Sequence, residues 1–254
     1  MLVPMRAILD AADKNGYAQG AFNVNAVCQV KAAVDVHQIL RSPAIIQGAD
    51  LANGFMGGRT DFANSTLEDK KAGAKNIGAA VKKYAADSDI PVALHLDHGK
   101  NFDSCIAAIE GGYTSVMIDG SSLPFDENVE LTREVVKYAH ERGVTVEGEL
   151  GVLAGVEDHV FAATSTYTNP LSAIDFFKKT GVDALAISYG TMHGANKGKN
   201  AVIRKEIAIA IKECMLHEGI EGYLVSHGSS TVPQYIVEEI NALGGETQMH
   251  TESM

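Results

Sequence analysis

Residues 91–120 read PVALHLDHGKNFDSCIAAIEGGYTSVMIDG, and this stretch contains a complete strand–helix–strand pattern. Apolar runs over Pro91–Leu96 and Thr114–Ile118 predict two buried strands. Between them, apolar residues recur at the spacing of one helix face, at Phe102, Cys105, Ile106 and Ile109. Gly111-Gly112 then ends the predicted helix. Such a unit joins two parallel strands through a right-handed helical crossover.

The same alternation repeats along the chain, and we count seven strand–helix units. The seven strands are predicted over Gln19–Val24, Ala44–Gln47, Pro91–Leu96, Thr114–Ile118, Val144–Glu149, Ala184–Ser188 and Tyr223–Ser226. Most of these runs are too apolar for half-exposed strands, which indicates a sheet covered on both faces. The pattern predicts an α/β fold with a parallel sheet, either a doubly wound sheet or a (β/α)₈ barrel.

Two features favour the α/β barrel of the (β/α)₈ TIM-barrel type. The first strand–helix turn, Asn23–Ala26, is not a glycine-rich dinucleotide loop, and polar residues gather at the carboxyl ends of at least four strands. We expect a single barrel domain over residues 1–245, followed by a divergent polar tail over 246–254. The tail has no strand pattern, so we expect the eighth strand to be missing and the chain to be C-terminally truncated.

Composition restricts the partners. The chain has 254 residues, and its 21 Lys and Arg against 32 Asp and Glu give a net charge of −11. This acidic balance argues against nucleic-acid binding, which needs a basic surface. Three dispersed cysteines without CxxC spacing are typical of a reducing compartment. No signal-peptide pattern or membrane-length apolar run is present, so we expect a cytoplasmic protein with no membrane partner.

Three histidines follow predicted strands and are each followed by glycine: His98, His193 and His227. Side chains at the carboxyl ends of barrel strands converge on one point, and three imidazoles with an open position make a catalytic metal site. His95 shares a strand face with Asp97, and we interpret it as a packed, hydrogen-bonded interior residue.

Carboxylates form a second group near the same strand ends. Asp97 lies beside a proposed ligand and is the natural general acid and base. Asp119 ends a strand, and Glu149 lies within the next one. Glu157-Asp158 follows in a glycine-containing loop, where a functional and a merely solvated pair are equally compatible with the pattern. The residues alone also leave open a zinc hydrolase on a barrel, although Gly228-Ser229-Ser230 beside a ligand favours phosphate binding.

Taken together, these motifs make the chain similar to a known family. It resembles the class II, zinc-dependent fructose-bisphosphate aldolases and their tagatose-bisphosphate relatives over about residues 1–245. The resemblance rests on seven segments: 20–25 (GAFNVN), 95–99 (HLDHG), 114–120 (TSVMIDG), 124–129 (PFDENV), 146–151 (VEGELG), 190–194 (GTMHG) and 227–230 (HGSS).

The resemblance implies a (β/α)₈ barrel that performs reversible, metal-dependent aldol cleavage. His98, His193 and His227 would bind a catalytic Zn²⁺, which would act as a Lewis acid on the substrate ketone. Asp119 and Glu149 would hold a second divalent position. Asp97 would move the proton of the hydroxyl at the cleaved bond, and Glu157 would exchange the proton on the enediolate carbon.

The substrate implied by the resemblance is a small phosphorylated sugar. Asn23 would contact it, while Gly194, Gly228 and Ser230 would bind a phosphate, with a monovalent cation nearby. The family also implies a homo-oligomer, a dimer or a tetramer. The choice between fructose and tagatose bisphosphate stays open, as does zinc against cobalt, iron or manganese. The family's eighth-strand motif and later arginine are not found, so an inactive truncated relative that only binds metal is a further alternative.

Overall fold

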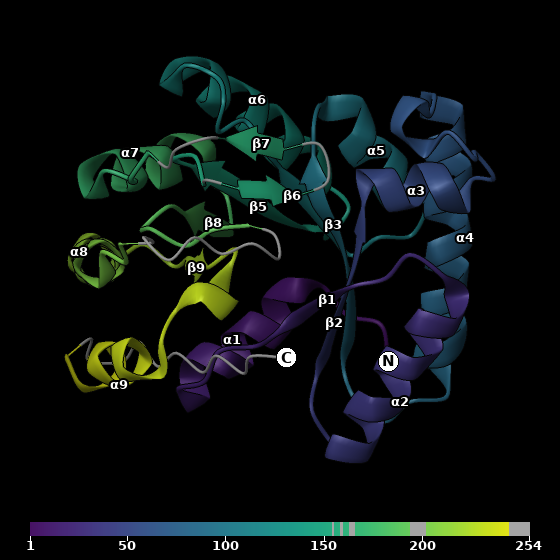
Figure 1. Cartoon of the computed structure of the whole chain (residues 1–254), viewed down its shortest axis with the longest axis horizontal. Coiled ribbons are helices and arrows are strands. Elements are labelled where there is room, and N and C mark those ends of the chain that lie inside the picture. Colours follow the sequence, from purple (N-terminus) through teal and green to yellow (C-terminus); the bar gives the residue numbers. More distant parts are fainter. Residues whose placement is uncertain (154, 158–159, 163–165, 194–201, 244–254) are drawn as a thin grey trace. The chain divides into compact units, whose positions relative to one another are not determined.

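The computed structural model of the chain describes residues 1–153, 155–157, 160–162, 166–193 and 202–243 (Figure 1). The chain divides into two compact units. Unit 1 comprises Met1–Asp10, Gln19–Asp119 and Glu134–Glu147, and unit 2 comprises Ala11–Ala18, Gly120–Arg133 and Gly148–Met254. The prediction of a single barrel domain over 1–245 stays a prediction. The tail, residues 246–254, lies outside the described residues.

All seven predicted strands are present, which confirms the α/β class. The strands are β1 (Ala21–Asn23), β2 (Ala44–Ala49), β3 (Val92–Gly99), β4 (Ser115–Ile118), β5 (Thr145–Leu150), β6 (Gly155–Glu157), β7 (Val160–Ala162), β8 (Ala184–Ile187) and β9 (Tyr223–Val225). The main sheet has the order β1-β2-β3-β4-β5-β8-β9 and therefore follows the chain. Its neighbouring strands pair in parallel wherever the register is described. The helices are α1 (Met5–Asn15), α2 (Val27–Leu40), α3 (Asp50–Met56), α4 (Leu67–Ala86), α5 (Phe102–Glu110), α6 (Phe125–His140), α7 (Pro170–Thr180), α8 (Lys205–Glu218) and α9 (Gln234–Leu243), with 3₁₀ turns η1 (Phe62–Asn64) and η2 (Ser229–Thr231).

Strict strand–helix alternation is wrong in two places. Between β2 and β3 the chain forms α3 and η1 before α4, which begins at a capping box of Thr66 and Asp69. Between β5 and β8 it forms an antiparallel hairpin, in which Glu157 of β6 faces Val160 of β7. The sequence analysis placed Glu157 in a loop. Three-residue strands are too short for periodicity to reveal them.

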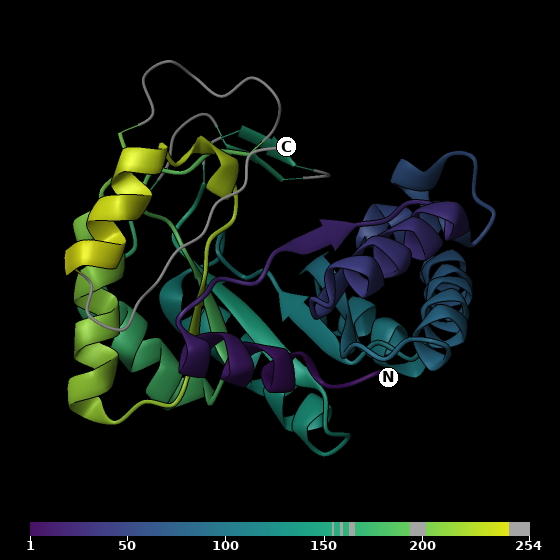
Figure 2. The ribbon, with the colours of Figure 1, turned by 90° about the horizontal axis from the view of Figure 1, so that it is seen from below.

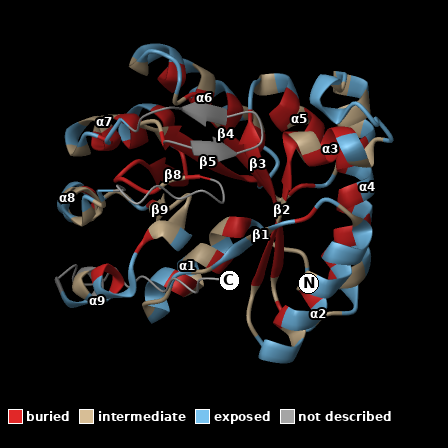
Figure 3. Ribbon diagram, viewed as in Figure 1, coloured by how far each residue is buried: buried red, intermediate tan, exposed pale blue. Residues whose placement is uncertain are grey.

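In unit 1 the strands β2, β3 and β4 are almost wholly buried, and helices cover them (Figure 3). Helices α2 and α4 lie side by side, as do α4 and α5 (Figures 1 and 2). Glycine permits the close packing of α4: a Cβ at Gly73 would lie 1.7 Å from the Asn53 carbonyl oxygen, and one at Gly78 would lie 2.0 Å from that of Gly111. Only hydrogen fits at these two positions.

In unit 2 the helix α7 has the ends that its sequence predicts. The Asn169 side chain accepts hydrogen bonds from the backbone N–H groups of Leu171 and Ser172, Pro170 opens the helix, and Gly181 ends it with a φ of 69°. A cap of this kind stabilises a helix by about 1 kcal/mol. Strand β8 pairs in parallel with β9, so both strands direct their carboxyl ends the same way. Those ends lead to His193 and His227.

None of the described helices is both long enough and apolar enough to cross a membrane.

Candidate active site and metal centre

His98 lies within β3, at a distortion of the strand. Its φ of 47° is left-handed, which is uncommon for a residue other than glycine, and the register of β3 against β4 shifts between Leu96 and Gly99. The sequence analysis placed His98 at the rim beyond the strand, whereas pairing continues as far as Gly99. A left-handed residue of this type costs about 1–2 kcal/mol. Such strain is concentrated at functional sites, and here it sets where the imidazole points.

A carboxylate orients the His98 ring. Its Nδ1 lies 3.0 Å from Oδ2 of Asp119, and its Nε2 lies 4.0 Å from Oδ1 of Asp97. If Nδ1 carries the proton and donates it to Asp119, the lone pair of the ring is on Nε2. This carboxylate–histidine pairing is typical of histidines that bind metals. The predicted ligand His98 and the predicted second-metal residue Asp119 are therefore brought together.

Asp97 is buried and oriented by Asn23. The Asn23 side-chain amide donates a 2.8 Å hydrogen bond to Oδ2 of Asp97, and Asp97 is 1% exposed. These residues belong to β1 and β3, which both flank β2. Asn23 can reach across because β2 carries only the small residue Ala49 in register with Asp97. Within the described part of the chain, no donor bonds to Oδ1 of Asp97. This oxygen is available to accept a hydrogen bond.

His95 is the packed interior residue that the sequence predicts. Its Nδ1 lies 2.8 Å from Oγ of Ser115, and its Nε2 lies 3.4 Å from Oε2 of Glu147. His95 and Glu147 are both buried. Two polar neighbours compensate for the loss of solvent around this ring, and we assign it no direct chemistry.

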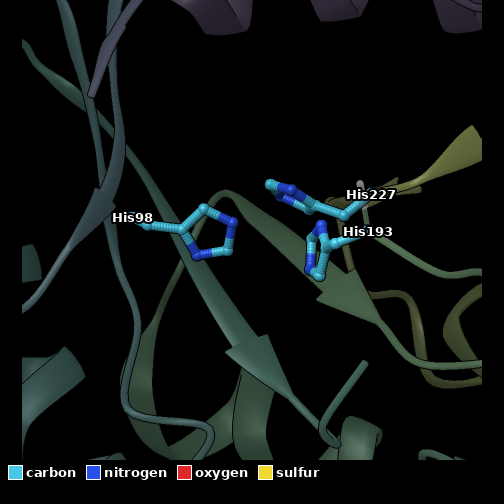
Figure 4. A group of neighbouring side chains, drawn as sticks. All are labelled: His98, His193 and His227. Atoms are coloured by element: carbon cyan, nitrogen blue, oxygen red, sulfur yellow. The ribbon is translucent and has the colours of Figure 1, made fainter. Parts of the chain in front are cut away.

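In unit 2, His193 and His227 lie next to each other. Their ring centroids are 5.9 Å apart with an interplanar angle of 65°, and Figure 4 shows the two rings beside each other at the ends of their loops. His193 follows β8 and is buried, while His227 follows β9. The parallel pairing of β8 with β9 therefore explains how residues distant in the sequence become neighbours. Imidazoles in this arrangement are suitable donors for a transition metal.

Glu149 lies near the carboxyl end of β5 and is buried. Its backbone carbonyl accepts a 2.8 Å hydrogen bond from the Asn128 side chain, which extends from the first turn of α6. Thr168 continues the bracing: Ser188 N–H donates to its Oγ1 at 2.8 Å, and Thr168 Oγ1 donates to the Leu150 carbonyl. The backbone around Glu149 is therefore held from two sides.

The predicted phosphate-binding residues are described in part. Gly228 has a φ of 61° and precedes η2, in which Ser230 lies. A Cβ on Gly228 would be 2.3 Å from the Met192 carbonyl oxygen, so glycine is required there. Gly194 lies outside the described residues. For Glu157 only the backbone in β6 is described.

One feature that the sequence analysis missed is a contact between two hydroxyl groups. The Tyr189 and Ser226 hydroxyl oxygens lie 2.6 Å apart, and either atom can be the donor. Burial raises the pKa of the Tyr189 phenol to about 12, although the hydrogen bond with Ser226 opposes this rise. No local sequence pattern predicts this pair, because its two residues are 37 positions apart.

Two of the most similar curated proteins carry the same name. The chain is 43% identical over 257 residues to a fructose-bisphosphate aldolase of Treponema pallidum (strain Nichols), covering 96% of this chain and 74% of that protein. It is 42% identical over 246 residues to the fructose-bisphosphate aldolase of Giardia intestinalis (strain ATCC 50803 / WB clone C6), covering 96% of this chain and 70% of the relative.

Solved structures agree on the fold. The YdjI aldolase from Escherichia coli K12 matches with a TM-score of 0.75 and 27% identity, covering 98% of this chain and 80% of that one. A putative fructose-1,6-bisphosphate aldolase from Coccidioides immitis matches with a TM-score of 0.78 and 25% identity, over 96% and 79%. The predicted TIM-barrel type of α/β fold is thereby confirmed.

The family assignment rests on nearly the whole chain rather than on one motif. The family model described as "Fructose-bisphosphate aldolase class-II" matches residues 3–246. This range includes every residue that the sequence analysis placed in the site. The chain therefore belongs to the class II fructose-bisphosphate aldolase family.

Proposed function

We infer that the chain is a metal-dependent lyase that cleaves fructose 1,6-bisphosphate reversibly into dihydroxyacetone phosphate and glyceraldehyde 3-phosphate. The observation that carries this conclusion is the identity of 37–43% to proteins named fructose-bisphosphate aldolase, over 96% or more of the chain. The proposed acid–base residue, Asp97, is buried and oriented within the part that matches.

We propose that His98, His193 and His227 hold one Zn²⁺. Their chemistry fits, because all three offer an imidazole nitrogen, a preferred donor for zinc. The pairing of His98 with Asp119 and the contact between His193 and His227 support the assignment. When bound, the ion supplies a Lewis acid for the substrate ketone. Asp119 and Glu149 would serve a second divalent position.

Asp97 is proposed as the acid–base group at the hydroxyl whose carbon–carbon bond breaks. In cleavage its carboxylate removes the hydroxyl proton, and in condensation it returns that proton. The hydrogen bond from Asn23 holds one carboxylate oxygen, so the other oxygen can face the hydroxyl in a fixed geometry. Asn23 also contacts substrate in this proposal. Such positioning is worth several kcal/mol in a reaction of this kind.

The remaining roles concern the other end of the substrate. Glu157 would exchange the proton on the carbon next to the ketone. Gly194, Gly228 and Ser230 would bind a phosphate through backbone N–H groups and a hydroxyl, with a monovalent cation nearby. The left-handed backbone at Gly228, directly before η2, supports this role, because such turns direct successive N–H groups toward an anion.

We also propose a homo-oligomer, a dimer or a tetramer, that acts in the cytoplasm on a small phosphorylated sugar. The acidic net charge of −11 is consistent with this assignment and with the absence of a nucleic-acid partner.

The deciding experiment is cleavage of fructose 1,6-bisphosphate by the 254-residue chain, followed through the dihydroxyacetone phosphate released. We expect turnover that is lost with EDTA and restored by added Zn²⁺. Turnover that EDTA does not affect would overturn the metal-dependent assignment. Zinc binding without turnover would support the alternative that the chain is an inactive relative that only binds metal.

Two parallel assays separate the alternatives. Tagatose 1,6-bisphosphate, offered under the same conditions, tests the stereochemical preference by comparison of kcat/KM for the two sugars. Release of inorganic phosphate in place of triose phosphates would instead support a zinc hydrolase. The phosphate-binding residues proposed beside His227 predict that only triose phosphates are released.

A further inference from the structure

The hydroxyl pair of Tyr189 and Ser226 occupies a particular place in unit 2. Tyr189 lies between β8 and His193, and Ser226 lies between β9 and His227. The two oxygens are 2.6 Å apart, and Tyr189 is 1% exposed. Each partner therefore belongs to a loop that carries one of the two neighbouring histidines, and Ser226 directly precedes its histidine.

The contact between Tyr189 and Ser226 lies beyond the last described pair of residues in β8 and β9. The described register of β8 against β9 ends at Ala186 paired with Val225. Beyond that pair, the two segments lead to histidines whose ring centroids are 5.9 Å apart. The partly buried hydrogen bond between Tyr189 and Ser226 thus links the two loops beyond the described register.

A second set of contacts joins the same loops next to the histidines. The Met192 N–H donates to Oγ1 of Thr231 at 3.3 Å, and Thr231 Oγ1 donates to the Gly228 carbonyl. Gly228 also lies directly against the Met192 backbone, since a Cβ there would be 2.3 Å from the Met192 oxygen. The two loops are therefore joined twice, by the two hydroxyls and, next to the histidines, by these backbone contacts.

We propose that Tyr189 and Ser226 form a hydroxyl clamp that fixes the separation of His193 and His227 and thereby sets the affinity of this chain for its metal. The inference rests on the proposed metal site. Neither hydroxyl needs to touch the ion or the substrate, so both are positioning residues. Partners that orient metal ligands from behind typically contribute a factor of about 10–100 in metal affinity.

The phenol is suited to position rather than to react. With a pKa of about 12 it stays protonated at neutral pH, and burial is the main cause. A neutral hydroxyl in a partly buried contact makes a directional hydrogen bond whose loss is costly. Removing only the hydroxyl, as in Tyr189→Phe, leaves the buried ring in place and tests the bond itself.

The test compares Tyr189→Phe, Ser226→Ala and the double variant with the unaltered chain. The matched control is Tyr113→Phe: Tyr113 is equally buried, and its hydroxyl donates a 2.7 Å hydrogen bond to Asn53 in unit 1. Each protein is stripped of metal and titrated with Zn²⁺ by calorimetry. The visible spectrum of the Co²⁺ form reports ligand geometry, and urea unfolding of the metal-free protein reports stability.

We expect the Zn²⁺ dissociation constant to rise about tenfold in each clamp variant. The double variant should show no larger loss than either single one, because both substitutions remove the same interaction. The Co²⁺ spectrum should change in the clamp variants only, while Tyr113→Phe should lower the urea midpoint and bind Zn²⁺ normally.

Unaltered Zn²⁺ affinity in Tyr189→Phe would overturn the clamp, as would an equal loss of affinity in Tyr113→Phe. Absence of Zn²⁺ binding in the unaltered chain would instead reject the proposed metal site. In that case the urea data still decide on the clamp: independent, additive losses in the two single variants would show that the hydroxyls do not act together.

Discussion

Replacing Gly228 by alanine should lower both the stability of the protein and its affinity for Zn²⁺, although the substitution adds only a methyl group. Gly228 has a φ of 61°, and an added Cβ would lie 2.3 Å from the Met192 oxygen. Gly219, at the end of α8, has nearly the same backbone, with a φ of 65°, but a Cβ there meets nothing within 4 Å. The two glycines therefore share the conformational penalty and differ in the steric contact.

The magnitudes follow from this comparison. Placing an alanine in the left-handed region costs about 1–2 kcal/mol, and Gly219→Ala should lose only that amount of unfolding free energy. Non-bonded carbon and oxygen atoms prefer separations of about 3.3 Å or more, so Gly228→Ala must also move its loop by about 1 Å relative to Met192. Overpacking of this kind costs about 1–3 kcal/mol more. Because Met192 precedes His193, the displacement reaches a proposed ligand.

The assay combines urea unfolding of the metal-free proteins with Zn²⁺ titration. We expect Gly228→Ala to be less stable than Gly219→Ala by about 1–3 kcal/mol and to lose Zn²⁺ affinity by about tenfold or more, while Gly219→Ala binds Zn²⁺ normally. Equal stability losses together with unaltered Zn²⁺ binding in both variants would show that the contact with Met192 does not constrain the loop.

Three further predictions concern acid–base chemistry, orientation and pH. Asp97→Ala should abolish cleavage while Zn²⁺ stays bound, and His193→Ala should lose Zn²⁺. Calorimetry measures Zn²⁺ binding and the cleavage assay measures turnover. The reverse pattern would contradict the assignment of Asp97 as the acid–base group and His193 as a ligand. Asn23→Ala should lower kcat by about 10–100-fold, because a hydrogen bond to a charged group is worth about 1.5–3 kcal/mol; unchanged kcat would argue against orientation of Asp97. Burial raises the pKa values of Tyr113 and Tyr189, the latter to about 12. The phenols therefore ionise first in the unfolded chain, and the free energy of unfolding should fall as the pH rises from 10 toward 12. Urea unfolding against pH measures this fall, and an equally steep fall in Tyr189→Phe would contradict the contribution of Tyr189.

Local patterns predicted the fold well. Strands such as β3 and β8 could be predicted because a short apolar run can be buried on both faces of a parallel sheet. The ends of α7 could likewise be predicted, because Asn169, Pro170 and Gly181 satisfy or break hydrogen bonds within a few residues of themselves. The hairpin β6–β7 escaped prediction because its strands are too short to show a period.

The candidate site was predicted in its members but not in its geometry. His98 and Asp97 could be selected because they end a strand, yet the left-handed backbone of His98 and the shift of register beside it depend on pairing with β4. The orientation of Asp97 by Asn23 likewise requires β1 and β3 to lie on either side of β2, with the small residue Ala49 in register with Asp97.

Local sequence patterns were sufficient to predict the α/β class, the positions of the seven strands, and the histidines and carboxylates at the strand ends. Those properties depend on periodicity and on residue type, which act over a few positions. Which side chains meet depends instead on the folded chain: Asn23 meets Asp97, Asp119 meets His98, and Tyr189 meets Ser226. Contacts between residues 21 to 74 positions apart depend on strand register and side-chain packing, and these are set by the whole folded unit rather than by any segment of it.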